Sequence, residues 1–294
     1  MSITGNKRNR APKKNTDEAP QVQALQESMS SIKHKFIVMS SQGGVGKTSV
    51  LVNLAVALAK RGVKVGLMDA NHHGPDIHRM LGLEAVIAGN LAKRFIPVAY
   101  SNDVKVASIG SVMQDSDETG GWGKPLKISD TRRFISSVNW GSLDYLFIDT
   151  PPGPGEGLLT MIRAIPEAKT IIITAPNKIG RDRAKKMIDF LEKEKIPILG
   201  WIENMRGFFC QNCGGRQELF STGSGSRAVF LGDIPFLGRL PIDPNIVECA
   251  DAGEPFLEKY PESEVAEACN LIAEKIWRGN KPSLSKDRPC LLYT

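Results

Sequence analysis

The chain of 294 residues lacks any apolar run long enough to span a membrane, and its first residues are polar and basic without an apolar core. We therefore expect neither a membrane partner nor a secretory signal, and a cytoplasmic location. Cysteines are few: five, an odd number, with two of them in a Cys-x-x-Cys pair. This usage favours a reducing compartment and a metal site over a disulfide framework.

Acidic residues are fewer than basic ones, and the formal net charge is +6. Much of the basic excess lies near the two ends, at Lys7, Arg8, Arg10, Lys13, Lys14, Arg278, Lys281, Lys286 and Arg288. Solvated basic tails explain this distribution, so no specific nucleic-acid partner is expected. We predict a mobile basic extension over residues 1–33, in which the segment around Val22 to Ile32 has weak helical spacing and allows a short helix, then one domain over residues 34–277 and a polar tail over residues 278–294.

Short apolar runs alternate with helical patterns through the predicted domain. Strands are predicted at Lys35–Met39, Val63–Asp69, Phe95–Tyr100, Val104–Ile109, Asp144–Asp149, Thr170–Ala175, Ile196–Ile202 and within Pro235–Pro244. Helices are predicted at Asn53–Ala59, Arg181–Lys193, Asn245–Ala250 and Glu264–Trp277. This alternation predicts one α/β unit with a mainly parallel sheet and helices on both faces.

A glycine-rich turn joins the first strand to the first helix. Glycines let backbone N–H groups turn toward a phosphate, and the start of a helix adds free N–H groups and a positive dipole end. Lys47 would contact the β- and γ-phosphates, and the Thr48 hydroxyl would be a Mg²⁺ ligand. Ser41 replaces the first glycine of the G-x-x-x-x-G-K-[ST] pattern, so a turn that binds nothing is the alternative. The nucleotide-binding residues predicted here are Gly43, Gly44, Val45, Gly46, Lys47, Thr48 and Ser49, which indicates a P-loop NTPase fold.

Two strands of the predicted sheet end in aspartate. Asp69 and Asp149 should both face the phosphates, because ligands bind beyond the carboxyl ends of parallel strands. Asp149 would hold the hydration shell of Mg²⁺, with an ordinary cap as the alternative. His72 and His73 follow Asp69; adjacent side chains on an extended loop point apart, so solvation is a better interpretation than metal ligation.

Cys210 and Cys213 form the Cys-x-x-Cys pair, in a glycine-rich loop at residues 206–216. Two such thiolates bind one metal ion or one edge of an iron–sulfur cluster. Since two ligands are too few, a second copy of the chain would supply the rest. Redox exchange and no function are the alternatives. Cys249 and Cys269 fall in helical patterns and are predicted to be core residues.

Six motifs occur in a characteristic order. They are residues 42–48, Asp69 with Gly74-Pro75, residues 149–153, Glu203-Asn204-Met205, Cys210-x-x-Cys213 and residues 240–244. Over roughly residues 34–277 the chain resembles the Mrp/ApbC/Nbp family of iron–sulfur cluster carriers, which are deviant Walker A ATPases related to MinD and ParA. The resemblance implies a dimer that binds ATP at its interface, bridges a 4Fe–4S cluster between its subunits and passes clusters to recipient apo-proteins.

The resemblance also implies roles by motif position. Lys47, Asp69 and Asp149 are the expected catalytic residues, where Asp69 is the first acid of a D-x-D motif. The Mg²⁺ ligands are expected to be Thr48 and Asp149, and the cluster ligands Cys210 and Cys213. The residues expected near the adenine are Asn204, Pro241 and Asp243.

Two departures from the family pattern concern hydrolysis. Gln42 stands where the family has a lysine that neutralises phosphate charge across the interface, and an amide brings no charge. Asn71 stands at the second acid of D-x-D and cannot accept a proton from water. The segment after the proline pair also differs, as Gly153-Pro154-Gly155-Glu156. We predict that ATP binds with Mg²⁺ and that its hydrolysis is slow.

Other interpretations remain open. One is a MinD/ParA-like switch that recruits a partner through nucleotide-dependent dimerisation. Another is a nucleotide-binding subunit with a structural zinc ion, because zinc and a cluster require similar ligands. The dimer itself is either a homodimer or a heterodimer with a homologue that supplies the missing lysine.

Overall fold

The structure is a computed structural model that describes residues 25–71, 74–84, 95–110, 128–153, 155–165, 167–209, 215–217, 231 and 233–279. Its strands are β1 (Ile32–Ser40), β2 (Val65–Asp69), β3 (Val98–Ala99), β4 (Val104–Ser108), β5 (Leu143–Asp149), β6 (Lys169–Thr174), β7 (Ile198–Glu203), β8 (Phe208–Phe209), β9 (Arg216–Gln217) and β10 (Phe236–Arg239). Its helices are α2 (Lys47–Ala59), α3 (Ile77–Met80), α5 (Ile128–Ser137), α6 (Glu156–Ala164), α7 (Lys178–Lys193), α8 (Asn245–Ala252), α9 (Phe256–Lys259) and α10 (Glu264–Arg278).

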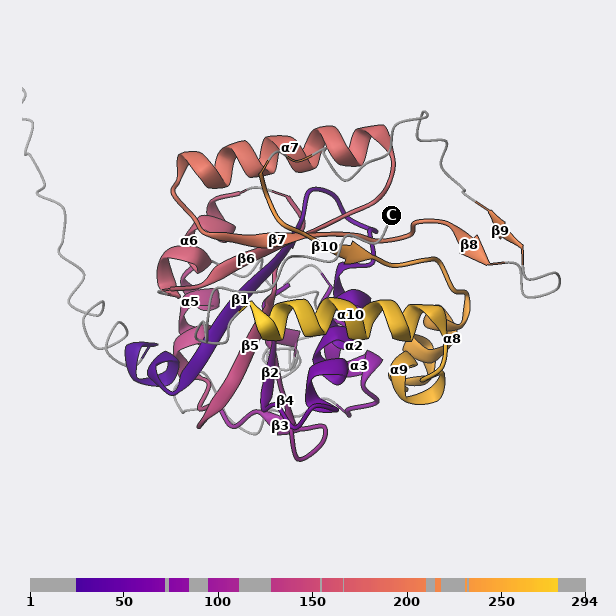
Figure 1. The fold of residues 1–294 in the computed structure, drawn as a ribbon. Helices are drawn as coiled ribbons and strands as arrows, with labels where there is room; N and C mark the ends of the chain where they lie inside the picture. Colours follow the sequence, from indigo (N-terminus) through magenta and orange to yellow (C-terminus); the bar gives the residue numbers. More distant parts are fainter. Residues whose placement is uncertain are drawn as a thin grey trace, which may run out of the picture.

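Eight strands form one sheet in the order β10-β7-β6-β1-β5-β2-β4-β3 (Figure 1). Every neighbouring pair is parallel except β3 with β4. The predicted run Phe95–Tyr100 forms only the two-residue β3, and Pro97 within it has no N–H to donate to a neighbouring strand. The sheet therefore has the mainly parallel α/β arrangement that the sequence predicted.

The sheet is buried on both faces. Along β1, Phe36 and Val38 enter one core with α2, α8, α9 and α10, whereas Ile37 and Met39 enter the other with α5, α6 and α7. Successive strand residues point to opposite faces, so a continuous apolar strand needs a helical layer on each side. In Figure 1, α5, α6 and α7 lie toward the left and top of the view, and α2, α8, α9 and α10 lie toward its lower centre and right. No helix in the described part of the chain is both long and apolar enough to cross a membrane.

The folded part of the chain begins before the predicted boundary at residue 34. Residues 25–30 are helical, and β1 starts at Ile32. Met29 and Ile32 are buried, and the Ser28 hydroxyl donates to the Val138 carbonyl at 2.6 Å. These apolar contacts place residues 25–33 in the domain and not in an extension. Residues 1–24 and 280–294, predicted to be tails, lie outside the described ranges.

A second, two-stranded antiparallel sheet is formed by β8 and β9. It follows β7 in the chain and lies away from the main sheet in Figure 1. Its base remains tied to the domain, because Phe208 forms a bridge with Ile242 and the Ile242 N–H donates to the Gly207 carbonyl at 2.9 Å. In the sequence, the predicted cysteine pair lies between the two strands of this hairpin.

Candidate functional site

The predicted phosphate loop spans residues 41–46, between β1 and α2. Gly44 and Gly46 both have φ of 75°, a left-handed conformation that favours glycine. Ser41, at the position where the motif has glycine, is buried, and its hydroxyl is 3.4 Å from the Gly180 carbonyl it donates to. Helix α2 begins at Lys47, directly after this turn. Its first backbone N–H groups have no carbonyl one turn earlier, which suits them to bind an anion.

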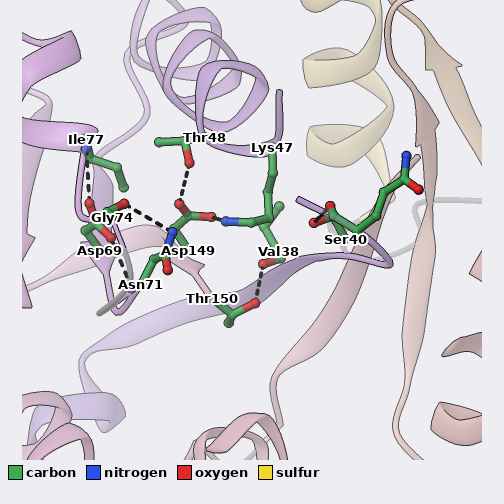
Figure 2. A network of polar contacts seen from close by, with 11 residues as sticks. Val38, Ser40, Lys47, Thr48, Asp69, Asn71, Gly74, Ile77, Asp149 and Thr150 are labelled. Atoms are coloured by element: carbon green, nitrogen blue, oxygen red, sulfur yellow. Dashed lines mark hydrogen bonds and ion pairs between the residues drawn. The ribbon is translucent and has the colours of Figure 1, made fainter. Parts of the chain in front are cut away.

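The carboxylate of Asp149 joins the two side chains predicted to serve phosphate and Mg²⁺. Figure 2 shows Lys47 Nζ paired with one oxygen of Asp149, and the Thr48 hydroxyl donates to the other at 2.7 Å. Asp149 is fully buried and the Lys47 side chain is 7% exposed. Burial raises the pKa of Asp149, while Lys47 and Thr48 oppose that rise. A hydroxyl beside a carboxylate fits Mg²⁺, which prefers oxygen ligands.

Asp69 lies beside Asp149 because β2 and β5 are parallel neighbours in which these two residues are in register. Its carboxylate accepts the backbone N–H groups of Asn71 and Ile77, each at 3.1 Å (Figure 2). Burial, and next the charge of Asp149, raise the pKa of Asp69 to about 7. Asp69 therefore holds the following turn in place, and the Asn71 amide donates to the Gly74 carbonyl within that turn.

The segment after β5 packs against the start of the phosphate loop. The Thr150 hydroxyl donates to the Val38 carbonyl at 2.9 Å, and the Gly153 N–H donates to the Ser40 carbonyl at 2.9 Å. The ends of β1, β5 and β2 thus bring Lys47, Thr48, Asp69 and Asp149 together. Lys47 and the α2 N-terminus are the donors that a polyphosphate requires, so these residues fit a nucleotide with its metal ion.

Asn204 follows β7 and makes a contact that sequence patterns do not reveal. Its side chain is buried, and its amide donates to the Val45 carbonyl in the phosphate loop at 2.8 Å. Pro241 and Asp243 belong to the segment that follows β10. This segment lies beside Asn204, because the Leu240 N–H donates to the carbonyl of Glu203, the residue before Asn204, at 2.9 Å. The structure therefore places Asn204 against the phosphate loop. The motif position of Asn204 indicated a place near an adenine and did not predict this contact.

The cysteine pair, Cys210 and Cys213, lies outside the described residues, as do His72 and His73. In the sequence, both cysteines lie between β8 and β9. The prediction of core positions for Cys249 and Cys269 is confirmed, since Cys249 in α8 and Cys269 in α10 are free and buried. Among the side chains that the structure describes, no three His, Cys, Asp or Glu residues are grouped to hold a metal ion.

Comparison with known proteins identifies the family. The profile of the ParA family described as NUBPL iron-transfer P-loop NTPase matches residues 31–277. The chain belongs to this family. An iron-sulfur cluster carrier protein of Methanocaldococcus jannaschii is 40% identical over 261 residues, covering 88% of this chain and 90% of the relative. A cytosolic Fe-S cluster assembly factor Nubp2 homolog of Anopheles gambiae is 36% identical over 250 residues, covering 83% and 96%.

Solved structures confirm the P-loop NTPase fold. A nucleotide-binding protein of Archaeoglobus fulgidus in complex with ADP has a TM-score of 0.65 and 33% identity, covering 83% of this chain and 98% of that one. The cell division ATPase MinD of Pyrococcus furiosus, at 23% identity and a TM-score of 0.59, shares the fold over 83% of this chain and 98% of its own. The predicted fold class and the resemblance to iron–sulfur carriers are both confirmed.

Proposed function

We propose that this family member is an ATP-dependent carrier that assembles a 4Fe–4S cluster at a dimer interface and transfers it to apo-proteins in the cytoplasm. The pairing of Lys47 and Thr48 with the buried Asp149 carries the nucleotide part, because it unites the groups that phosphate and Mg²⁺ need. Relatives named as iron-sulfur cluster carriers and as cytosolic assembly factors support the cargo and the location. The Cys-x-x-Cys spacing of Cys210 and Cys213 supports their role as cluster ligands.

Dimer formation follows from the ligand count. One Cys-x-x-Cys pair offers two thiolates, and a 4Fe–4S cluster is usually held by four. Two copies related by a two-fold axis supply the full set.

The experiment is iron, acid-labile sulfide and zinc analysis of anaerobically purified protein. We expect about four iron and four sulfide per dimer, lost in Cys210→Ser/Cys213→Ser. The matched control is Cys249→Ala/Cys269→Ala, which changes the two buried core thiols and should keep the iron. About one zinc per dimer would instead support a structural metal site. A nucleotide-dependent dimer without metal would support a MinD/ParA-like switch.

Slow hydrolysis is part of the same proposal. Gln42 brings no charge to a phosphate, and the Asn71 amide is engaged with the Gly74 carbonyl inside its own turn. Gln42→Lys should increase ATP turnover by the homodimer, since phosphoryl transfer depends on charge stabilisation. If a lysine-bearing homologue restores turnover to the wild-type chain, the functional species is a heterodimer. Wild-type turnover equal to that of lysine-bearing relatives, and lost in Lys47→Ala, would refute slow hydrolysis.

A further inference from the structure

A short segment between β7 and β8 connects the phosphate loop to the cysteine hairpin. At its start, the Asn204 amide donates to the Val45 carbonyl at 2.8 Å, and the Asn204 N–H donates to the Thr174 carbonyl at 2.8 Å. At its end, Phe208 opens β8. Cys210 is six positions after Asn204 in the chain. A side chain that contacts the phosphate loop is therefore close in the chain to the predicted cluster ligands.

Met205, the next residue of this segment, also lies against the phosphate loop. It has φ of 64°, a left-handed conformation that a residue with a side chain adopts only when its surroundings require it. A Cβ added to Gly46 would lie 3.7 Å from Met205 Cε and 2.5 Å from Asn204 Nδ2, so both side chains lie directly on the phosphate loop. A side chain at position 46 would therefore displace Asn204.

The rest of the segment is held rigidly to its neighbours. The carboxylate of Glu203, 7% exposed, lies 3.6 Å from the Arg206 guanidinium and 3.1 Å from that of Arg239. The Arg206 N–H donates to the Leu240 carbonyl at 2.9 Å, and Gly207 accepts from Ile242. The buried Glu203–Arg206 ion pair and these backbone hydrogen bonds restrain the segment between Asn204 and the hairpin. A contiguous set of such contacts is the kind of network through which two sites can be coupled.

We propose that Asn204 is a positioning residue that, together with Met205, couples the conformation of the phosphate loop to the hairpin that carries Cys210 and Cys213. The coupling rests on the proposed function only in that the loop must bind a nucleotide. When the loop rearranges around phosphates, the Val45 carbonyl that accepts the hydrogen bond from Asn204 changes position. The segment 204–208 then moves the base of β8, and the environment of the two thiols changes with it.

The test measures thiol alkylation in metal-free protein, with and without Mg²⁺ and a non-hydrolysable ATP analogue. A Cys290→Ser background leaves the pair and the two buried core cysteines. Mass spectrometry then gives the alkylation rates of Cys210 and Cys213. We expect the analogue to change these rates by about fivefold, which corresponds to roughly the 1 kcal/mol that one buried hydrogen bond contributes.

Three variants make the test specific. Asn204→Asp keeps the shape of the side chain but removes the N–H donor, and Met205→Gly relieves the left-handed backbone while deleting the side chain that touches Gly46. Both should lose the nucleotide dependence. Asn53→Asp is the matched control, because Asn53 is also buried and also donates to a carbonyl, that of Ser49 at 2.8 Å, but within α2. It should retain the dependence.

Analogue binding is measured on the same samples, and every variant is assayed at saturation. Wild-type rates that do not respond to bound analogue would overturn the coupling, as would a response preserved in Asn204→Asp. If Asn204→Asp no longer binds the analogue, Met205→Gly decides in its place. A wild-type chain without analogue binding would overturn both the coupling and the nucleotide part of the proposed function. Absence of iron in the separate metal analysis would affect the proposed function alone.

Discussion

Lys47 is expected to stabilise the fold as well as to bind phosphate, and Lys47→Met tests this role. Methionine keeps an unbranched apolar stem but removes the charge that faces Asp149, a carboxylate with no exposed surface. Breaking a buried ion pair by removing one partner typically costs about 3–5 kcal/mol, because the other charge remains buried. In a domain of this size that loss lowers the unfolding midpoint by on the order of 10 °C.

Calorimetry of nucleotide-free protein with EDTA near pH 8 is the assay. Lys47→Met/Asp149→Asn should restore the free energy of unfolding to within about 1 kcal/mol of the wild type, because no buried charge is stranded. The deficit of the single variant should also shrink as the pH falls. Loss of Lys47 raises the pKa of Asp149 further, and a protonated carboxyl needs no cation.

Lys35→Met is the matched control. The Lys35 side chain is also 7% exposed, but its partner Glu167, at 3.8 Å, is 86% exposed. Water solvates the glutamate that is left behind, so the cost should stay near 1 kcal/mol. Equal losses in Lys35→Met and Lys47→Met, or an unchanged midpoint in Lys47→Met, would refute the reasoning. A confirmed loss means that inactivity of any Lys47 variant must be compared with its stability before it is assigned to catalysis.

Two further predictions follow from the same site. The pKa of Asp69 is raised from 3.8 to about 7, so the nucleotide-free folded state favours the neutral carboxyl. This preference contributes on the order of 4 kcal/mol to the free energy of unfolding below pH 3.8, and the contribution disappears as the pH rises to about 7. The difference in free energy of unfolding between wild type and Asp69→Asn, from denaturant titrations, should fall across this window and then level off; a pH-independent difference would contradict the assignment. Gly46→Ala should destabilise the fold more than Gly44→Ala. Both glycines have φ of 75°, so the backbone strain is the same in the two variants. A Cβ at position 46 would lie 2.5 Å from Asn204, whereas nothing lies within 4 Å of a Cβ at position 44. Equal midpoints for the two variants in thermal unfolding would show that Asn204 does not brace the loop.

Much of the architecture could be predicted from local chemistry. The apolar runs before Asp69 and Asp149 are strands, and their aspartates meet because parallel strands end at the same edge of the sheet. Cys249 and Cys269 could be assigned to the core from helical spacing. The left-handed turns at Gly44 and Gly46 are accessible because glycine lacks a Cβ. These properties depend on residues near each other in the chain, so they are readable without the fold.

The contacts that distinguish this site depend on strand order. Lys47 and Asp149 are separated by 102 positions, and Asn204 and Val45 by 159. Their pairing arises because β1 lies between β5 and β6, with β7 next to β6. No spacing within the sequence encodes that arrangement, which is set by how the two apolar faces of the sheet are buried. The sequence therefore specified which groups can bind phosphate, and the tertiary structure decided which partners hold them.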